Sequence, residues 1–94
     1  MTVLRIEHPI FDYNGWKKAF DSDPIDRKKS GVKSYRVYRP ADDPKYVIID
    51  LLFDSITEAE NTLSALQKLW GKVEGTVMAN AKTGIFEVVE DNMC

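Results

Sequence analysis

Residues 45–53 read Lys-Tyr-Val-Ile-Ile-Asp-Leu-Leu-Phe, a run of β-branched and large apolar residues that predicts the strongest strand of the chain. Every second position is apolar without interruption in the set Val47, Ile49, Leu51 and Phe53. The opposite set is also mostly apolar, and Asp50 is its one carboxylate. Because a strand that is apolar on both faces must be covered on both, we expect residues 45–53 at the centre of a sheet.

Two further strands are predicted before this one. β-branched and aromatic residues predict a strand at 32–39. The turn residues 40–44 connect it to the central strand, so that the two strands form an antiparallel hairpin. Alternating apolar and polar residues predict a first strand at 2–8, with Leu4 and Ile6 on the apolar face.

Helical spacing replaces the alternation between these strands. We expect a helix over 12–22 with Asp12 as its N-cap. Pro24 is tolerated only at the first position of a helix, so it predicts a new helical piece over 24–30 that ends at Gly31.

A long helix is predicted after the central strand. It begins at Asp54 or Ser55, and Ser55 with Glu58 has the spacing of a capping box. Gly71 is its expected stop. The apolar stripe of this helix consists of Ile56, Ala59, Leu63, Leu66 and Trp70.

The rest of the chain gives weaker signals. Residues 72–82 are ambiguous, with a short helix near 73–79 as one interpretation. A last strand is predicted at 85–90, with no decision on which of its faces is covered. Residues 91–94 are expected to fray.

The predicted order is βαββαβ, the ferredoxin-like pattern of the α+β class. A four-stranded antiparallel sheet then carries the two main helices on one face and leaves the other face open. The residues expected on the open face are Arg5, Arg36, Tyr38, Tyr46, Ile48, Asp50 and Leu52. This half-apolar surface suits a dimer interface or a ligand cavity.

Length and composition limit the possible functions. The chain has 94 residues, so we expect one domain over 1–94, small enough to gain stability from oligomerisation. A net charge of -2 argues against general binding to nucleic acid or membranes. The single cysteine, Cys94, cannot form an internal disulfide, and its terminal position makes it a poor nucleophile. Without a signal peptide or an apolar run of membrane-spanning length, the expected location is the cytoplasm.

His8 and Asp50 are the candidate catalytic residues. His8 is the only side chain whose ordinary pKa lies near neutrality, and its alternative role is a structural hydrogen bond to a neighbouring loop or to Asp12. Asp50 interrupts an apolar strand, where a carboxylate needs a partner, a proton or a cavity. Its alternative role is an ion pair with Arg5 or Arg36. No metal-ligand spacing or nucleotide-binding motif is present, so no cofactor is expected.

Several aromatic and basic residues are candidates for ligand binding. Trp16 and Phe20, four positions apart, fit a pocket wall or the core. Tyr38 and Tyr46 are predicted to shape a pocket on the open face. Residues 27–39 hold six basic residues, including Arg36, and no acidic one, which leaves RNA binding as an alternative.

A familiar spacing extends from His8 into the central strand. It comprises His8, Asp12-Tyr13, Trp16-Lys17, Ala19-Phe20-Asp21, Arg27, Gly31, Tyr35-Arg36-Val37-Tyr38-Arg39, Asp42-Asp43-Pro44 and Phe53-Asp54. With it the chain resembles small dimeric α/β-barrel proteins of the cyclase-like and antibiotic-biosynthesis-monooxygenase-like group over residues 3–60. The resemblance implies a sheet that packs against that of a second subunit, and a hydrophobic or aromatic ligand. Some relatives oxidise polyketides without metal or flavin.

Other relatives in that superfamily degrade haem with an Asn, a Trp and a His. The second predicted helix here has Asn61 and Trp70 but no His, so haem is not expected.

The leading hypothesis is therefore a homodimer that holds a small hydrophobic or aromatic molecule between sheet and helices. As an enzyme it would be a cofactor-independent monooxygenase or cyclase-like protein. His8 or Asp50 would move a proton, Arg36 would hold an anion or enolate, and Tyr38 and Tyr46 would shape the pocket. The alternatives are a non-catalytic dimeric binding module and an RNA-binding ferredoxin-like domain.

Overall fold

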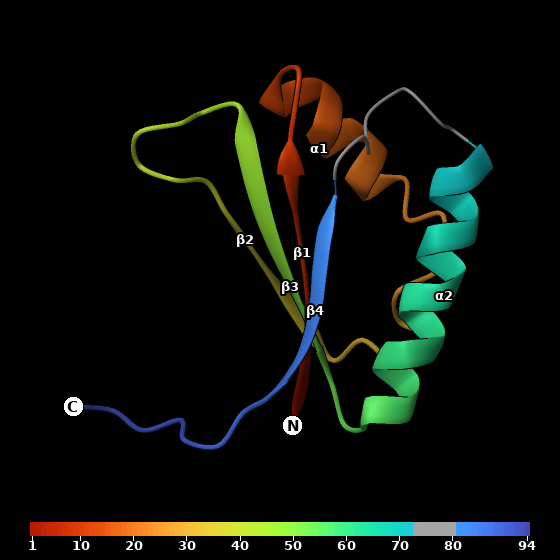
Figure 1. The fold of residues 1–94 in the computed structure, drawn as a ribbon, viewed down its shortest axis with the longest axis vertical. Coiled ribbons are helices and arrows are strands. Elements are labelled where there is room, and N and C mark those ends of the chain that lie inside the picture. The colour runs from red at the N-terminus through yellow and green to blue at the C-terminus, as the bar shows by residue number, and fades with distance from the viewer. Residues whose placement is uncertain (73–80) are drawn as a thin grey trace.

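The computed structural model describes residues 1–72 and 81–94. Its elements are β1 (Thr2–Pro9), α1 (Tyr13–Asp21), β2 (Ser34–Tyr38), β3 (Tyr46–Phe53), α2 (Ile56–Lys72) and β4 (Lys82–Glu87). The strands form a four-stranded antiparallel sheet in the spatial order β2-β3-β1-β4 (Figure 1). This confirms the ferredoxin-like arrangement and the central position of residues 45–53.

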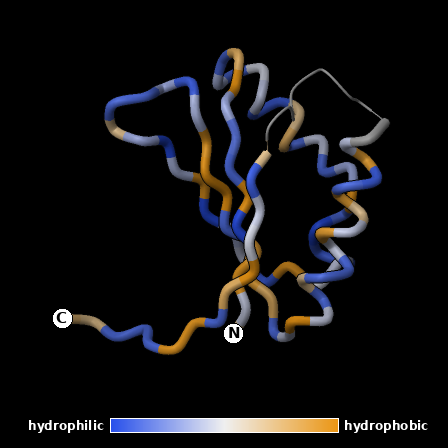
Figure 2. The backbone as a smooth tube through the Cα atoms, viewed as in Figure 1, coloured by the Kyte–Doolittle hydropathy of each residue, from blue (hydrophilic) through white to orange (hydrophobic). Residues whose placement is uncertain are grey.

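The core lies on the sheet face that both helices cover. Hydrophobic and hydrophilic residues alternate along the strands and along α2 (Figure 2). β1 and β3 turn their apolar sets inward, and α1 adds Trp16 while α2 adds Ala59. The buried apolar residues are Leu4, Ile6, Ile10, Trp16, Val47, Ile49, Leu51, Phe53 and Ala59. The helices therefore share one face, and the other face of the sheet carries neither of them.

Side-chain caps fix the beginnings of both helices. Asp12 has extended backbone angles, and its carboxylate accepts a hydrogen bond of 2.7 Å from the Gly15 amide. Ser55 Oγ accepts from the Glu58 amide at 3.2 Å and donates to the Glu58 carboxylate at 3.3 Å. Both predicted helix starts are confirmed, because each cap satisfies an amide that the first helical turn leaves free.

The predicted helical piece over 24–30 is wrong, because turns occupy this segment. Asp23 and Asp26 both adopt a left-handed backbone, each with a φ of 52°. Their carboxylates accept hydrogen bonds from the amides of Arg27 and Lys29, at 2.9 and 3.3 Å. Such bonds from a side chain to the backbone compete with the helical pattern, and here they replace it.

The last strand begins earlier than predicted. β4 spans Lys82–Glu87, whereas the sequence indicated 85–90. β4 pairs antiparallel with β1, from Lys82 opposite Glu7 to Glu87 opposite Thr2. Because β1 begins at Thr2, β4 has no partner residues beyond Glu87 and the pairing ends there. Ile85 packs against the core, and Phe86 lies on the open face, which settles the orientation of this strand. Most of the ambiguous segment at 72–82, including the suggested helix at 73–79, lies outside the described residues.

Candidate functional site

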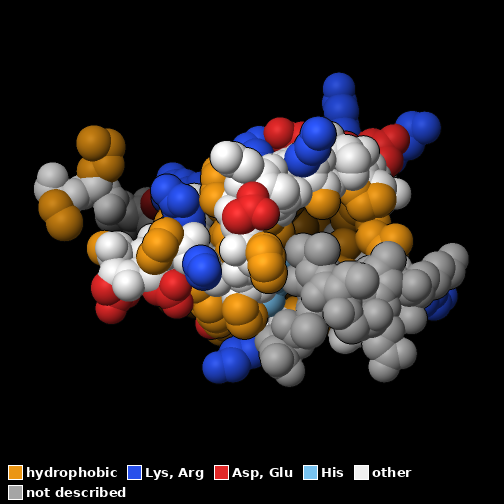
Figure 3. Space-filling model, turned by 90° about the horizontal axis from the view of Figure 1, so that it is seen from above, with side chains coloured by type: hydrophobic (Ala, Val, Ile, Leu, Met, Phe, Trp, Pro, Cys, Tyr) orange, Lys and Arg blue, Asp and Glu red, His pale blue; other side chains and the backbone are white. Residues whose placement is uncertain are grey.

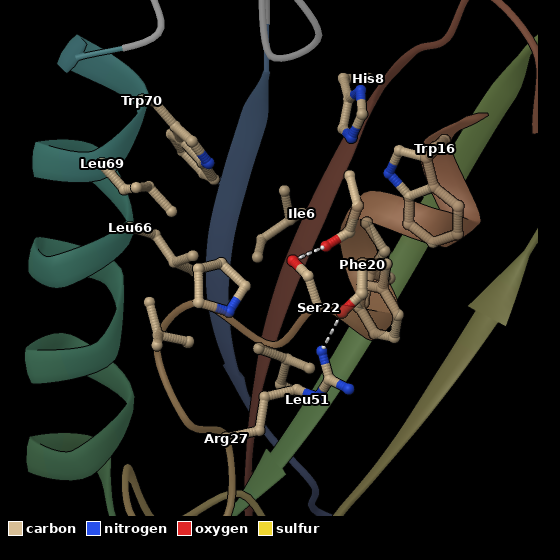
Figure 4. Close-up of a pocket in the computed structure, with 14 residues that line it drawn as sticks. Ile6, His8, Trp16, Phe20, Ser22, Arg27, Leu51, Leu66, Leu69 and Trp70 are labelled. Carbon is tan, nitrogen blue, oxygen red and sulfur yellow. Dashed lines mark hydrogen bonds between the residues drawn. The ribbon is translucent and has the colours of Figure 1, made fainter.

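A cavity of about 320 Å³ lies between the covered face of the sheet and the two helices. It draws residues from β1, β3, α1, α2 and the turns that follow α1 (Figure 4). Hydrophobic side chains gather around a hollow at this end of the molecule, and the histidine is in view beside them (Figure 3). The residues that line it are Ile6, His8, Trp16, Ala19, Phe20, Ser22, Pro24, Ile25, Arg27, Ile49, Leu51, Leu66, Leu69 and Trp70.

His8 is the buried titratable group of this cavity. It follows Leu4 and Ile6 on the inward set of β1 and has no exposed surface. Its Nδ1 lies 2.9 Å from the Pro9 carbonyl oxygen, and its Nε2 has no hydrogen-bond partner within the described residues. Burial disfavours the charged imidazolium, so the pKa of His8 is lowered, with the Pro9 hydrogen bond as a smaller opposing effect.

Aromatic rings form one wall of the cavity. Trp16 and Phe20 stack with their ring centroids 5.0 Å apart, one turn apart on α1. Tyr13 continues the row at 5.7 Å from Trp16, and Tyr35 meets Phe20 edge-on at 5.1 Å. Trp70 of α2 lies on the other side (Figure 4). Trp16 therefore belongs both to the core and to the cavity wall.

Arg27 reaches the cavity from the turn segment. Its guanidinium donates to the Phe20 carbonyl at 2.8 Å and lies 3.5 Å from the Asp23 carboxylate. It also lies over the rings of Phe20 and Tyr35, at 4.1 and 5.0 Å from their centroids. The positive charge of Arg27 thus lies against two aromatic faces at the edge of the apolar cavity.

Asp50 lies on the opposite face of the sheet and is paired there. Arg5 stands directly across from it on β1 and donates from Nε at 2.8 Å and from the terminal nitrogen at 2.9 Å. The hydrogen bonds to Asp50 raise the pKa of Arg5 above its already high ordinary value. Arg36 occupies the register position on the other side of Asp50, on β2. The ion pair, named above as the alternative role of Asp50, is formed with Arg5.

The remaining open-face candidates lie on the same face of the sheet as this ion pair. Tyr46 donates its hydroxyl to the Glu7 carboxylate at 2.7 Å, and this bond raises the pKa of the Tyr46 hydroxyl. Tyr38 is exposed on β2. Phe86 covers Gly84 on the edge strand, where a Cβ would come within 2.9 Å of its ring. An aromatic ring that shields a strand glycine in this way compensates for the missing side chain.

The structure thus divides the six predicted site residues between two faces. His8 and Trp16 line the cavity, whereas Asp50, Arg36, Tyr38 and Tyr46 do not. Of the two residues that the haem-related pattern singled out on α2, Trp70 lines the cavity and Asn61 is exposed. The sequence places Arg27 in the basic run and in the family-like spacing but predicts no site role for it, and it predicts none for Ser22, Pro24 and Ile25. No local pattern marks these residues, because they reach the cavity through turns.

The basic residues of 27–39 do not gather on one surface. Arg27 faces the cavity, Arg36 belongs to the open face, and Arg39 lies over the Tyr13 ring at 4.6 Å. Lys33 is 3.4 Å from the Asp54 carboxylate. RNA binding stays a prediction, and the dispersal removes the continuous stripe that motivated it.

Within residues 1–72 and 81–94, no three or more His, Cys, Asp or Glu side chains come together as a metal site. No helix in these same ranges has the length and apolar character needed to cross a membrane.

Comparison with solved structures finds the same architecture in several proteins. The haem degrader MhuD from Mycobacterium tuberculosis, solved with two haems in its active site, has a TM-score of 0.64 at 20% identity, over 97% of this chain and 99% of MhuD. An antibiotic biosynthesis monooxygenase candidate from Nitrosomonas europaea has a TM-score of 0.68 at 12% identity, over 94% of this chain and 89% of its own. A dimeric ferredoxin-like protein from an uncultured marine organism has a TM-score of 0.65 at 16% identity, over 97% of this chain and 96% of its own.

Sequence comparisons add no closer relative, since no family model and no curated protein matches the chain significantly. The structural likeness to each of the three proteins covers nearly the whole chain. Because the sequence identities are low, this likeness establishes the fold and no more. The chain therefore has the same ferredoxin-like fold as these proteins.

Proposed function

We propose that the protein is a homodimer in which each subunit holds a small hydrophobic or aromatic molecule in the cavity between sheet and helices. The observation that carries this proposal is the cavity itself, which has apolar walls and contains the buried Nε2 of His8, an atom with no hydrogen-bond partner among the described residues. Apolar walls with a few convergent polar groups are the usual composition of small-molecule sites.

The size of the cavity limits the ligand. A volume of about 320 Å³ is at the lower end of the range of roughly 300–1,000 Å³ for ligand pockets. This favours a molecule of one or two fused rings over a macrocycle such as haem. The stacked rings of Trp16 and Phe20, with Trp70 opposite, favour a planar molecule.

The activity that we propose is that of a cofactor-independent monooxygenase or cyclase-like enzyme with His8 as its proton-moving group. His8 is neutral near pH 7 because burial lowers its pKa, so its Nε2 can accept a proton from a bound molecule. The Nitrosomonas europaea protein is similar in fold and is described as a monooxygenase candidate, which supports this class of reaction.

A non-catalytic binding module is the second candidate. His8 forms its described hydrogen bond with a backbone carbonyl, and Asp50 lies on the other face of the sheet. In the part of the chain that the structure describes, His8 therefore has no carboxylate partner of the kind that orients the imidazole in many catalytic sites. Turnover of a bound ligand under air would favour the enzyme, and release of the unchanged ligand would favour the module.

Binding can be followed through the protein's own fluorescence. The chain has two tryptophans, and both Trp16 and Trp70 line the cavity. We expect the uncharged dye N-phenyl-1-naphthylamine to brighten on binding and to quench tryptophan emission with a saturable curve.

Two phenylalanine substitutions provide a matched comparison for this assay. Ala19 lines the cavity and Ala65 does not, although both are exposed helical residues. Ala19→Phe should weaken dye binding at least tenfold by filling the cavity, and Ala65→Phe should leave it unchanged. Equal binding by both variants would place the dye elsewhere and contradict the proposed site.

A further inference from the structure

The Nε2 atom of His8 is a buried polar atom that has no hydrogen-bond partner among the described residues 1–72 and 81–94. His8 has no exposed surface and lines the cavity near Trp16 (Figure 4). The other such side-chain atom within the described residues, Thr62 Oγ1, does not line the cavity. Buried polar groups are normally hydrogen-bonded, so an unpartnered one facing a cavity indicates that a bound molecule supplies the missing partner.

The hydrogen bond at the other ring nitrogen fixes what this partner must be. The Pro9 carbonyl oxygen can only accept, so Nδ1, 2.9 Å away, carries the hydrogen. In the neutral imidazole the second nitrogen is then a pure acceptor. Burial lowers the pKa of His8 and so favours this neutral form. The cavity therefore offers a hydrogen-bond acceptor to its ligand and needs a donor in return.

The side chains of Arg27, Trp16 and Trp70 also bring nitrogens to the cavity, but these can only donate, so they do not compete for a donor from the ligand. Ser22 Oγ donates its hydrogen to the Ala19 carbonyl at 2.6 Å, and Arg27 donates to the Phe20 carbonyl at 2.8 Å. Both groups thus direct hydrogens to the backbone of α1, as the dashed lines in Figure 4 show. Among the side-chain nitrogens of the described residues that line the cavity, Nε2 of His8 is thus the one that accepts a hydrogen bond.

We infer that the ligand carries an aromatic hydroxyl, which donates its hydrogen to Nε2 of His8 while its ring lies between the apolar and aromatic walls. This inference rests on the proposed function, because it names the chemical class that the same cavity selects. An apolar aromatic molecule of the same shape would displace any water from Nε2 and return no hydrogen bond. Leaving a buried acceptor unpaired in this way costs enough to discriminate strongly between the two.

Calorimetric titration with two matched probes tests the inference. 2-Naphthol and 2-methylnaphthalene have the same ring system and differ in one group of similar size, a hydroxyl or a methyl. We expect 2-naphthol to bind the full-length protein about tenfold more tightly or better. 2-Methoxynaphthalene, which has the oxygen but no hydrogen to donate, should bind no better than 2-methylnaphthalene.

Two substitutions at His8 separate the roles of its nitrogens. His8→Asn places an amide near the position of Nδ1 and removes the acceptor at Nε2, so the preference for 2-naphthol should disappear. His8→Gln reaches the position of Nε2 with an amide oxygen and should restore part of the preference. Circular dichroism checks that each variant is folded.

Nitrogen-15 NMR gives a readout that does not depend on a variant folding. His8 is the only histidine, so the imidazole signals need no assignment by mutation. Without ligand, they should show the hydrogen on Nδ1. Saturation with 2-naphthol should shift Nε2 toward the value of a hydrogen-bonded nitrogen, and 2-methylnaphthalene should not.

The outcomes distinguish failure of the inference from failure of the proposed function. Equal affinity for both probes, or an Nε2 signal that 2-naphthol does not move, would overturn the hydroxyl assignment and leave the cavity as a binding site. Binding of none of the probes up to their solubility would overturn the proposed function and the inference together.

Discussion

Arg5 and Asp50 form a two-point ion pair on the sheet face that the helices leave free. The two residues are direct cross-strand partners of β1 and β3, and both guanidinium–carboxylate contacts are shorter than 3 Å: 2.8 and 2.9 Å. Two parallel hydrogen bonds of this kind are stronger and more directional than a single contact. The ion pair with Arg5 therefore explains why the carboxylate of Asp50 is tolerated in the most apolar strand.

Replacement of Asp50 by Asn should lower stability without affecting the cavity. Because the Arg5 side chain is 43% exposed and solvent screens the pair, we expect a loss of about 1 kcal/mol in the free energy of unfolding. Urea denaturation at one fixed protein concentration measures it. Asp54→Asn is the control, since the Lys33–Asp54 pair is more exposed and spans 3.4 Å. A loss of dye binding in Asp50→Asn would contradict the separation of the two faces.

The stability of the protein should fall as the pH falls below about 6.5, through the buried His8. The pKa of His8 is lowered in the folded state by burial. Between the ordinary pKa and this lowered one, the unfolded chain binds a proton that the folded chain does not. Stability from this group is thus complete above about pH 6.5 and is lost on acidification, by at most about 1.4 kcal/mol per pH unit.

His8→Asn isolates this contribution because it removes the titrating group. The difference in unfolding free energy between wild type and variant, measured from pH 7.5 to 5, should shrink as the pH falls. A difference that stays constant over this range would mean that His8 titrates alike in the folded and unfolded states.

Alternating strands were predicted well from the sequence because their pattern is local. The inward set of β1, with Leu4, Ile6 and His8, and the pairing of β2 with β3 follow from alternation and turn residues. The boundaries of β4 do not, because the length of β1 sets them. Likewise, the side chains of Asp23 and Asp26 can cap a helix or close a turn, and only the surrounding packing decides between these roles.

The candidate site could be predicted only where a residue lies on a regular element. His8 on β1 and Trp16 on α1 have directions that follow from the periodicity of strand and helix. Arg27 reaches the cavity through turns, and its direction depends on the Phe20 carbonyl and the ring faces that it contacts. Because these contacts join residues that no local pattern connects, the basic run at 27–39 does not predict them.

Gly31→Ala should destabilise the protein by about 1–2 kcal/mol. Gly31 has a φ of 100°, a conformation that strains any residue with a Cβ. A Cβ there would also collide with the carboxylate of Glu58, the residue that contacts Ser55 at the start of α2. The same substitution in a Glu58→Ala background should cost less, because only the backbone strain remains. An equal cost in both backgrounds would show that the collision contributes nothing.

The open face should be the surface through which two copies associate. It carries Val3, Leu52 and the half-exposed Phe86 in one cross-strand row, and such exposed apolar surface is expected to be covered. Leu52→Lys would place a charge in the middle of this row and should convert the dimer to a monomer, because an unpaired ammonium is costly to bury. Ile56→Lys, which adds the same charge at an exposed position on α2, should remain dimeric. Sedimentation equilibrium measures both masses.

A wild-type protein that is monomeric at micromolar concentration would remove the homodimer from the proposed function. A dimer that survives Leu52→Lys would show that the interface lies on another surface.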